Sequence, residues 1–277
     1  DNEFIPAAID KLAVAYEKSE NWAYAAATYE EIARREKDGK RRGDLLWQTA
    51  DLYLKAGLKD NAMEMFKQYV RDFPKPVEPA VEARLKLADM YKESNDTQKR
   101  QYWLQQIIKA DKNDGSTDRT RFLAANATLE LAEPTYNAYR KVQLVQPLKK
   151  NLKRKKQLLE DSIKAFTSAA NYSVADVTTA STYMIADAYN EFSKALFKSE
   201  RPKGLDTAAL EEYEALLEDQ AYPFEEKSID IHEANAIRTH QGVYDQWVKK
   251  SLNALRKLQP ARYAKNEKSE LFANLIN

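Results

Sequence analysis

One short pattern, Ala-x-x-Tyr, recurs three times in the N-terminal part of the chain and constrains its fold more than any other feature. The three copies are Ala13 with Tyr16, Ala50 with Tyr53, and Ala88 with Tyr91. This spacing places the small and the aromatic side chain on one helical face, so a neighbouring helix can approach closely at the alanine. The recurrence predicts a stack of similar helical units.

Each copy is followed by a short turn and by a second apolar pattern at helical spacing. The turns carry Glu20-Asn21, Gly57 and Asn95-Asp96. The second patterns consist of small and large apolar residues: Ala25, Tyr29 and Ile32; Ala62, Phe66 and Tyr69; Leu104 and Ile107. We therefore expect three antiparallel helix pairs, of which the second ends at Pro74.

These units resemble the tetratricopeptide repeat, a helix-turn-helix unit of about 34 residues with small and aromatic residues at such offsets. The second copy, "TADLYLKAGLKDNAMEMFKQYVRDFP" from Thr49, is the cleanest match, whereas the third has Arg100 where a small residue is usual. The resemblance implies an all-α fold, a right-handed superhelical solenoid of antiparallel helix pairs. A further signature, "IADAY" from Ile185, recurs later.

Longer helical patterns follow the repeats. One apolar stripe continues across Pro134, which is expected to kink its helix rather than end it, and the next helix is expected to begin near Pro147. Only six glycines and nine prolines occur among 277 residues, a composition that favours helices over hairpins. We predict three helix pairs over residues 1–112, a long helical hairpin with a further repeat-like helix over 113–200, and a C-terminal helical module over 201–277.

The repeat resemblance also implies where a partner binds, because the first helix of each pair lines the inner wall of such a stack. Asp10, Asp51 and Asp89 recur at one offset on these helices and would form an acidic ladder. Trp47, Leu54 and Leu85 would provide apolar anchors beside it. A basic, extended protein segment suits this wall, and Trp47 is either its hot spot or a core residue.

A basic run and an acidic segment lie in the later part of the chain. Eight bases and no acid fall between Arg140 and Lys156, while ten acids and a single base fall between Asp206 and Glu233. The bases share their helix with an apolar stripe, so they form a solvated face or an electrostatic contact through Lys149, Lys150, Lys153 and Lys156. Nucleic acid is disfavoured because no aromatic residue interleaves these lysines and the net charge is only +1.

The sequence predicts no catalytic, metal or cofactor site. The chain has no cysteine, and its two histidines, His232 and His240, are too far apart for the spacing of a zinc protease. The structural interpretation of His232 is a helix residue that meets a nearby carboxylate. Paired carboxylates acting on envelope glycans stay open as an alternative. No segment is expected to span a membrane.

The C-terminal third contains "SERPKGLDTAALEEYEALLEDQAYPFEEKSIDIHEANA" and "GVYDQWVKKSLNALRKLQPARYAKNE". Over residues 185–265 the chain resembles bacterial envelope tetratricopeptide proteins that accompany TonB-ExbB-ExbD-type systems or gliding motility. The resemblance implies a periplasmic scaffold in a Gram-negative envelope, with outer-membrane association through a part not in this chain left open. Homo-oligomers could form through Phe272 and Leu275 in the tail.

We therefore expect a non-enzymatic scaffold or adaptor that binds a protein partner along the concave wall. Two other functions stay open. One is a nucleic-acid-binding helical repeat that uses residues 140–156. The other is the envelope glycan hydrolase.

Overall fold

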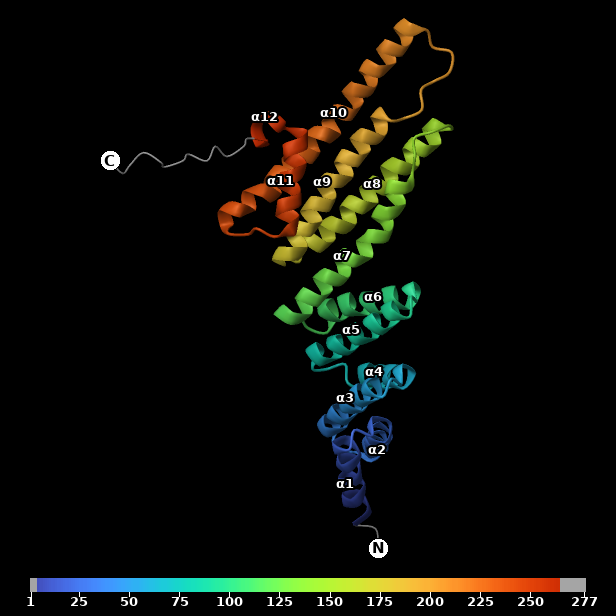
Figure 1. The fold of residues 1–277 in the computed structure, drawn as a ribbon, viewed down its shortest axis with the longest axis vertical. Coiled ribbons are helices and arrows are strands. Elements are labelled where there is room, and N and C mark those ends of the chain that lie inside the picture. Colours follow the sequence, from blue (N-terminus) through green and yellow to red (C-terminus); the bar gives the residue numbers. More distant parts are fainter. Residues whose placement is uncertain (1–3, 265–277) are drawn as a thin grey trace, which may run out of the picture. The chain divides into compact units, whose positions relative to one another are not determined.

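The computed structural model describes residues 4–264, and every regular element in this range is helical. Contacts divide the chain into two compact units, residues 1–128 and 129–277, with the boundary inside α7. The helices run in the order α1 Phe4–Lys18, α2 Trp22–Arg35, α3 Gly39–Lys55, α4 Lys59–Asp72, α5 Val77–Glu93, α6 Thr97–Asn113, α7 Asp118–Lys141, α8 Leu148–Ala170, α9 Ala175–Phe197, α10 Thr207–Ile237, the 3-10 helix η1 Arg238–Gln241, α11 Gln246–Leu258 and α12 Pro260–Tyr263 (Figure 1).

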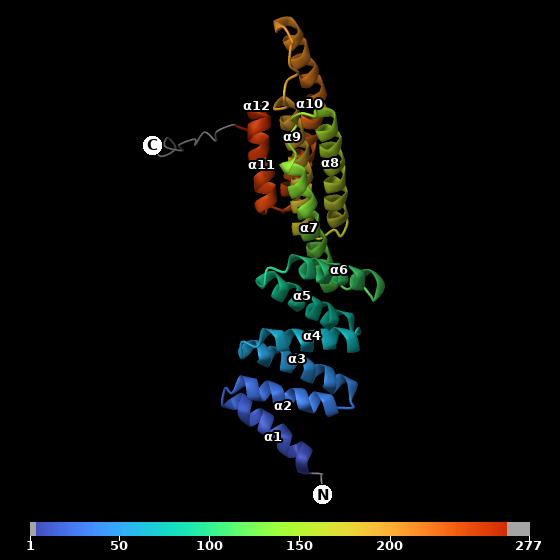
Figure 2. The ribbon, with the colours of Figure 1, turned by 90° about the vertical axis from the view of Figure 1, so that its right-hand side faces the viewer.

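The first unit consists of the three expected antiparallel pairs, α1 with α2, α3 with α4 and α5 with α6, stacked in chain order (Figure 2). The three repeat alanines, Ala13, Ala50 and Ala88, are all fully buried. A side chain of one methyl group lets the helix backbones approach closely at these points, while Tyr53 and Tyr91 fill the space beside them. The prediction of an all-α solenoid of helix pairs is confirmed.

The turn inside each pair has the same backbone geometry although its sequence differs. Glu20, Gly57 and Asn95 all adopt the left-handed conformation, with φ of 58°, 76° and 58°. The N–H of the next residue then donates to the carbonyl of the repeat tyrosine, Tyr16, Tyr53 or Tyr91, at 2.9 Å in each case. This closing bond ends the first helix of each pair and reverses the chain within two residues.

The second unit is built from longer helices around α9. Helix α9 packs against α8 on one side and α10 on another, and α11 lies across α9 and α10 (Figure 1). The core contains Phe166 of α8, Phe192 of α9 and Tyr139 of α7, all fully buried. The expected apolar stripe of α8 faces this core, and α8 begins directly after Pro147 as predicted.

Helix α7 continues through Pro134, as expected. The predicted three-part division at residues 112 and 200 is finer than the two units found, and it stays a prediction. Phe272 and Leu275, the residues expected to mediate self-association, lie outside the described residues.

Candidate functional site

All six predicted wall residues lie on the first helices of the pairs. Asp10 is on α1, Trp47, Asp51 and Leu54 are on α3, and Leu85 and Asp89 are on α5. Asp89 is exposed and the other five are half-buried. Their immediate contacts differ from one residue to the next. Their role in partner binding stays a prediction.

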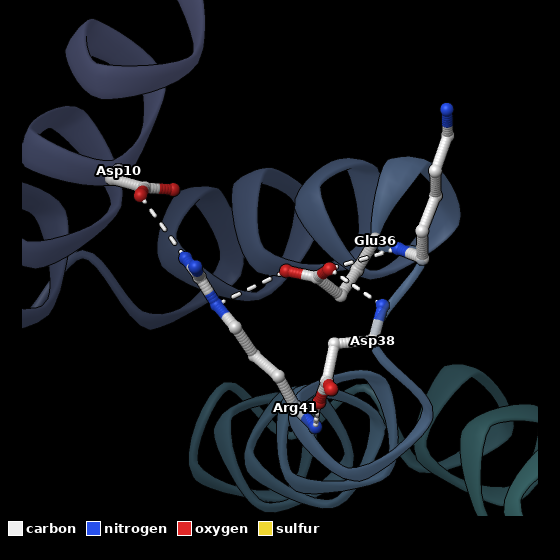
Figure 3. A network of polar contacts seen from close by, with 5 residues as sticks. Asp10, Glu36, Asp38 and Arg41 are labelled. Atoms are coloured by element: carbon white, nitrogen blue, oxygen red, sulfur yellow. Dashed lines mark hydrogen bonds and ion pairs between the residues drawn. The ribbon is translucent and has the colours of Figure 1, made fainter.

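Asp10 already holds a partner within the chain. The guanidinium of Arg41 contacts the Asp10 carboxylate at 3.2 Å and the Glu36 carboxylate at 3.1 Å (Figure 3). The second oxygen of Glu36 accepts from the backbone N–H groups of Lys37 and Asp38 at 2.8 and 2.9 Å, and the Asp38 side chain caps the N-terminus of α3. This network, on a hollow of about 340 Å³, fixes the linker between the first two pairs.

Asp89 also lies beside a base. Arg100 Nη1 is 3.5 Å from the Asp89 carboxylate and donates to the Ala88 carbonyl at 3.1 Å. Arg100, the departure from the repeat pattern, thus reaches back from α6 to α5 within the third pair. Asp10 and Asp89 are thus each paired with an arginine of the same unit.

Trp47 has a different environment, half core and half surface. Its ring meets Phe66 and Tyr69 edge-on, with centroids 5.4 and 5.3 Å apart, and it packs against the apolar core of the first unit. The same side chain lines a hollow of about 390 Å³ on the surface. Trp47 is therefore partly a core residue and partly a surface residue that a partner could contact.

Acidic side chains surround this Trp47 hollow. Asp44 lies one turn before Trp47 on α3, while Glu78 and Glu82 lie at the start of α5. Burial, together with the charge of Asp44, raises the pKa of Tyr69. Three carboxylates and two aromatic rings in one hollow produce a local preference for cations.

One base from the same unit occupies the rim of the Trp47 hollow. Arg119, at the start of α7, donates through Nε to the Glu82 carboxylate at 2.5 Å. The hydrogen bond to Glu82, followed by the charges of Glu82 and Glu78, raises the pKa of Arg119. Repeat spacing could not have identified Arg119, because it lies on α7, outside the three pairs. Glu78 precedes Glu82 by one helical turn, a signal that the sequence did contain.

The four lysines predicted for electrostatic contact, Lys149, Lys150, Lys153 and Lys156, are exposed on α8. Lys155, in the same basic run, is not part of this solvated face. Its side chain is only 3% exposed, and its ammonium donates to the carbonyls of Val142 at 2.9 Å and Tyr139 at 3.2 Å. Lys155 therefore satisfies carbonyls at the C-terminal end of α7, a role that charge-run reasoning missed.

The expectation that His232 meets a carboxylate is wrong. His232 is buried, and its Nδ1 lies 3.2 Å from the Ser251 hydroxyl of α11. Asn235 donates to the same hydroxyl at 2.9 Å and to the Thr179 carbonyl at 3.1 Å. Burial lowers the pKa of His232 to about 4, and the charge of Asp187 opposes this only in part. The cluster joins α9, α10 and α11.

Comparisons with known proteins agree with the architecture of the first unit. Residues 44–76 match the family model of the Tetratricopeptide repeat. The match is confined to this segment. It covers most of α3 and α4, the copy whose sequence was expected to match best. Tetratricopeptide repeats generally build extended surfaces for binding proteins rather than catalytic sites. No curated protein sequence matches the chain.

Among solved structures, the chain is similar to BtubC (BKLC) from P. vanneervenii, with 13% sequence identity and a TM-score of 0.34. The alignment spans 86% of the present chain and 82% of BtubC. It is also similar to the TPR domain of P58(IPK), with 14% sequence identity and a TM-score of 0.35. That alignment spans 94% of the present chain and 67% of the P58(IPK) domain. Within residues 4–264, no helix is both long enough and apolar enough to cross a bilayer.

Proposed function

We propose that the chain is a non-enzymatic scaffold whose first unit binds a basic, extended segment of a partner protein, with a lysine or arginine of that segment in the Trp47 hollow. The observation that carries this proposal is the acidic rim of Asp44, Glu78 and Glu82 around a half-buried tryptophan. A cationic side chain entering there would meet carboxylates and an aromatic face together, which a neutral or acidic side chain would not.

Arg119 supports this chemistry from within the chain. Its guanidinium already pairs with Glu82 in the hollow, so the acids accept a planar cation in the geometry that the structure has. An incoming cation would share the acidic rim with Arg119 and would be repelled by it. Arg119 therefore limits the affinity of the hollow for a basic segment.

The first test replaces Trp47. The probe is a fluorescent extended peptide in which lysines alternate with small residues, and the control probe has glutamate in their place. Trp47→Ala should weaken binding of the lysine peptide by about 30-fold or more, the range of an interface hot spot. Trp103→Ala on α6 is the matched control, because Trp103 packs against the same core. Equal losses in both variants, or wild-type binding of the glutamate peptide, would contradict the proposal.

The second test reverses the sign of the effect. Arg119→Gln removes the one base that lines the hollow among the described residues. It should tighten binding of the lysine peptide, by roughly threefold to tenfold at low ionic strength. Salt should shrink this gain, since the gain arises from screened charges. A merely structural Arg119 would give the opposite result, because its loss would loosen α5 and α7 and weaken binding.

We further propose that the scaffold works in a Gram-negative envelope complex on the periplasmic side. What supports this is the resemblance of residues 185–265 to envelope tetratricopeptide proteins. Crosslinking in the native cell, with separation of periplasmic, membrane and cytoplasmic fractions, tests the proposal. Recovery of the chain in the cytoplasm with ribosomal or RNA-bound partners would overturn it.

A further inference from the structure

The second unit contains a basic hollow that the proposed function does not use. It has a volume of about 330 Å³ and lies among the C-terminal part of α7, the segment that follows α7, and the facing sides of α8 and α9. Among the residues that the structure describes, four bases line it, Arg140, Lys155, Lys194 and Lys198, against a single acid, Glu191. In the described part of the chain no ion pair within 4 Å joins Glu191 to any of these bases.

Helix ends explain only some of this charge. Bases near the last turn of a helix are stabilised by its carbonyls, and Lys155 donates to two such carbonyls at the end of α7. The same ammonium lies 4.5 Å from the centroid of the Tyr139 ring. Lys155 therefore places a buried base, held by three contacts, in the wall of the hollow.

The other bases surround the same space from two further elements. Arg140 lies over the Tyr136 ring at 5.9 Å, which orients its guanidinium, while Lys194 and Lys198 lie one turn apart near the end of α9. Like charges gathered in this way repel one another, and Glu191 offsets only one of the four. A bound anion would offset the remainder.

We propose that this basic hollow is a binding site for a phosphoryl dianion, either free phosphate or the terminal phosphate of a larger ligand. A doubly charged group offsets more of the excess charge than a carboxylate does. The donors also come from three helices, which suits a tetrahedral anion with oxygens in several directions better than a planar one. The site is independent of the Trp47 hollow and would survive failure of the proposed function.

Calorimetric titration of the full chain with inorganic phosphate, pyrophosphate and acetate at constant ionic strength tests the site. Wild type should bind phosphate and pyrophosphate and should bind acetate at least tenfold more weakly. The double variant Lys194→Gln/Lys198→Gln removes two exposed charges and should weaken phosphate binding by roughly tenfold or more. The matched double variant Lys164→Gln/Lys249→Gln removes two exposed lysines elsewhere in the unit and should bind as wild type does.

Circular dichroism shows whether both double variants keep their helical fold. Loss of phosphate binding in a folded Lys194→Gln/Lys198→Gln variant would place the site at these lysines. Vesicles of phosphatidylcholine with phosphatidic acid identify the source of the phosphoryl group. Displacement of bound phosphate by these vesicles would mean that a lipid headgroup reaches the hollow, whereas phosphate binding without displacement would indicate a soluble ligand. The proposal is overturned if phosphate binds no better than acetate or if both double variants lose it equally.

Discussion

The two units of this chain achieve stability in different ways. The first repeats one solution three times: a buried alanine, a neighbouring aromatic ring and a left-handed turn residue that directs the next N–H onto a tyrosine carbonyl. The second has longer helices and relies on single buried polar contacts, such as Lys155 under the end of α7 and the cluster of His232, Asn235 and Ser251. Individual buried hydrogen bonds are thus added to the apolar core of the second unit.

This difference affects how each unit responds to change. In the first unit a lost contact removes one of several similar contacts, and small surface changes should have small effects. In the second unit Lys155 and Asn235 each bond to particular partners, so the loss of either side chain leaves a carbonyl without that hydrogen bond. The largest effects of single polar substitutions should therefore fall in the second unit.

The largest expected effect is that of Lys155→Ala. The substitution leaves the Tyr139 and Val142 carbonyls without this donor. It also removes a buried side chain whose ammonium lies 4.5 Å from the centroid of the Tyr139 ring. We expect a loss of about 3 kcal/mol in the free energy of unfolding. Urea denaturation of the full chain measures it, and hydrogen exchange should show the loss in α7 and α8.

Two further variants sharpen that result. Lys156→Ala changes the adjacent, exposed lysine and should alter the unfolding free energy by less than about 0.5 kcal/mol. Lys155→Met keeps most of the stem but no donor, so it should recover only part of the loss. If Lys155→Met were as stable as wild type, the hydrogen bonds to the two carbonyls would contribute nothing to the free energy of unfolding. The two units would then differ only in their apolar packing.

The next effect is a pH dependence specific to the second unit. Burial holds the pKa of His232 at about 4, whereas an unfolded histidine titrates near its ordinary value of 6.5. The unfolded chain therefore binds more protons below pH 6.5, and stability falls as the pH decreases from there toward 4. Between pH 7 and pH 5 we expect a loss of about 2 kcal/mol, measured by urea denaturation at both values.

The other histidine of the chain provides the control for this pH dependence. His240 is exposed, so His240→Gln should keep the wild-type difference between pH 7 and pH 5. His232→Gln should remove most of that difference, whatever its effect on stability at pH 7. A wild-type chain equally stable at both values would mean that water reaches the imidazole and that α11 does not seal it.

The sequence predicted the features that recur at regular spacing, and it missed contacts that occur once and join distant helices. The three pairs, their turns and the helix that continues through Pro134 follow from local patterns, which act within a few residues of the chain. Lys155 looked like its exposed neighbours because depth depends on where α7 and α9 lie. Arg119 and Glu191 likewise line their hollows only because helices distant in sequence pack beside them. His232 finds Ser251 of α11 rather than a carboxylate for the same reason.

The smallest expected effect tests whether the turns differ between the units. Glu20 and Ser173, one turn residue from each unit, both have φ of 58°, a conformation that glycine adopts without strain. Glu20→Gly and Ser173→Gly should each stabilise the chain, by about 0.5–1 kcal/mol, because relief of strain outweighs the added freedom of the unfolded chain. At the equivalent position in the second pair, Gly57→Ala should have the opposite sign and a similar size. Thermal and urea denaturation should agree.

Stabilisation by Glu20→Gly but not by Ser173→Gly would mean that the two units differ in their turns as well. Equal gains would mean that they differ only in the packing of their helices.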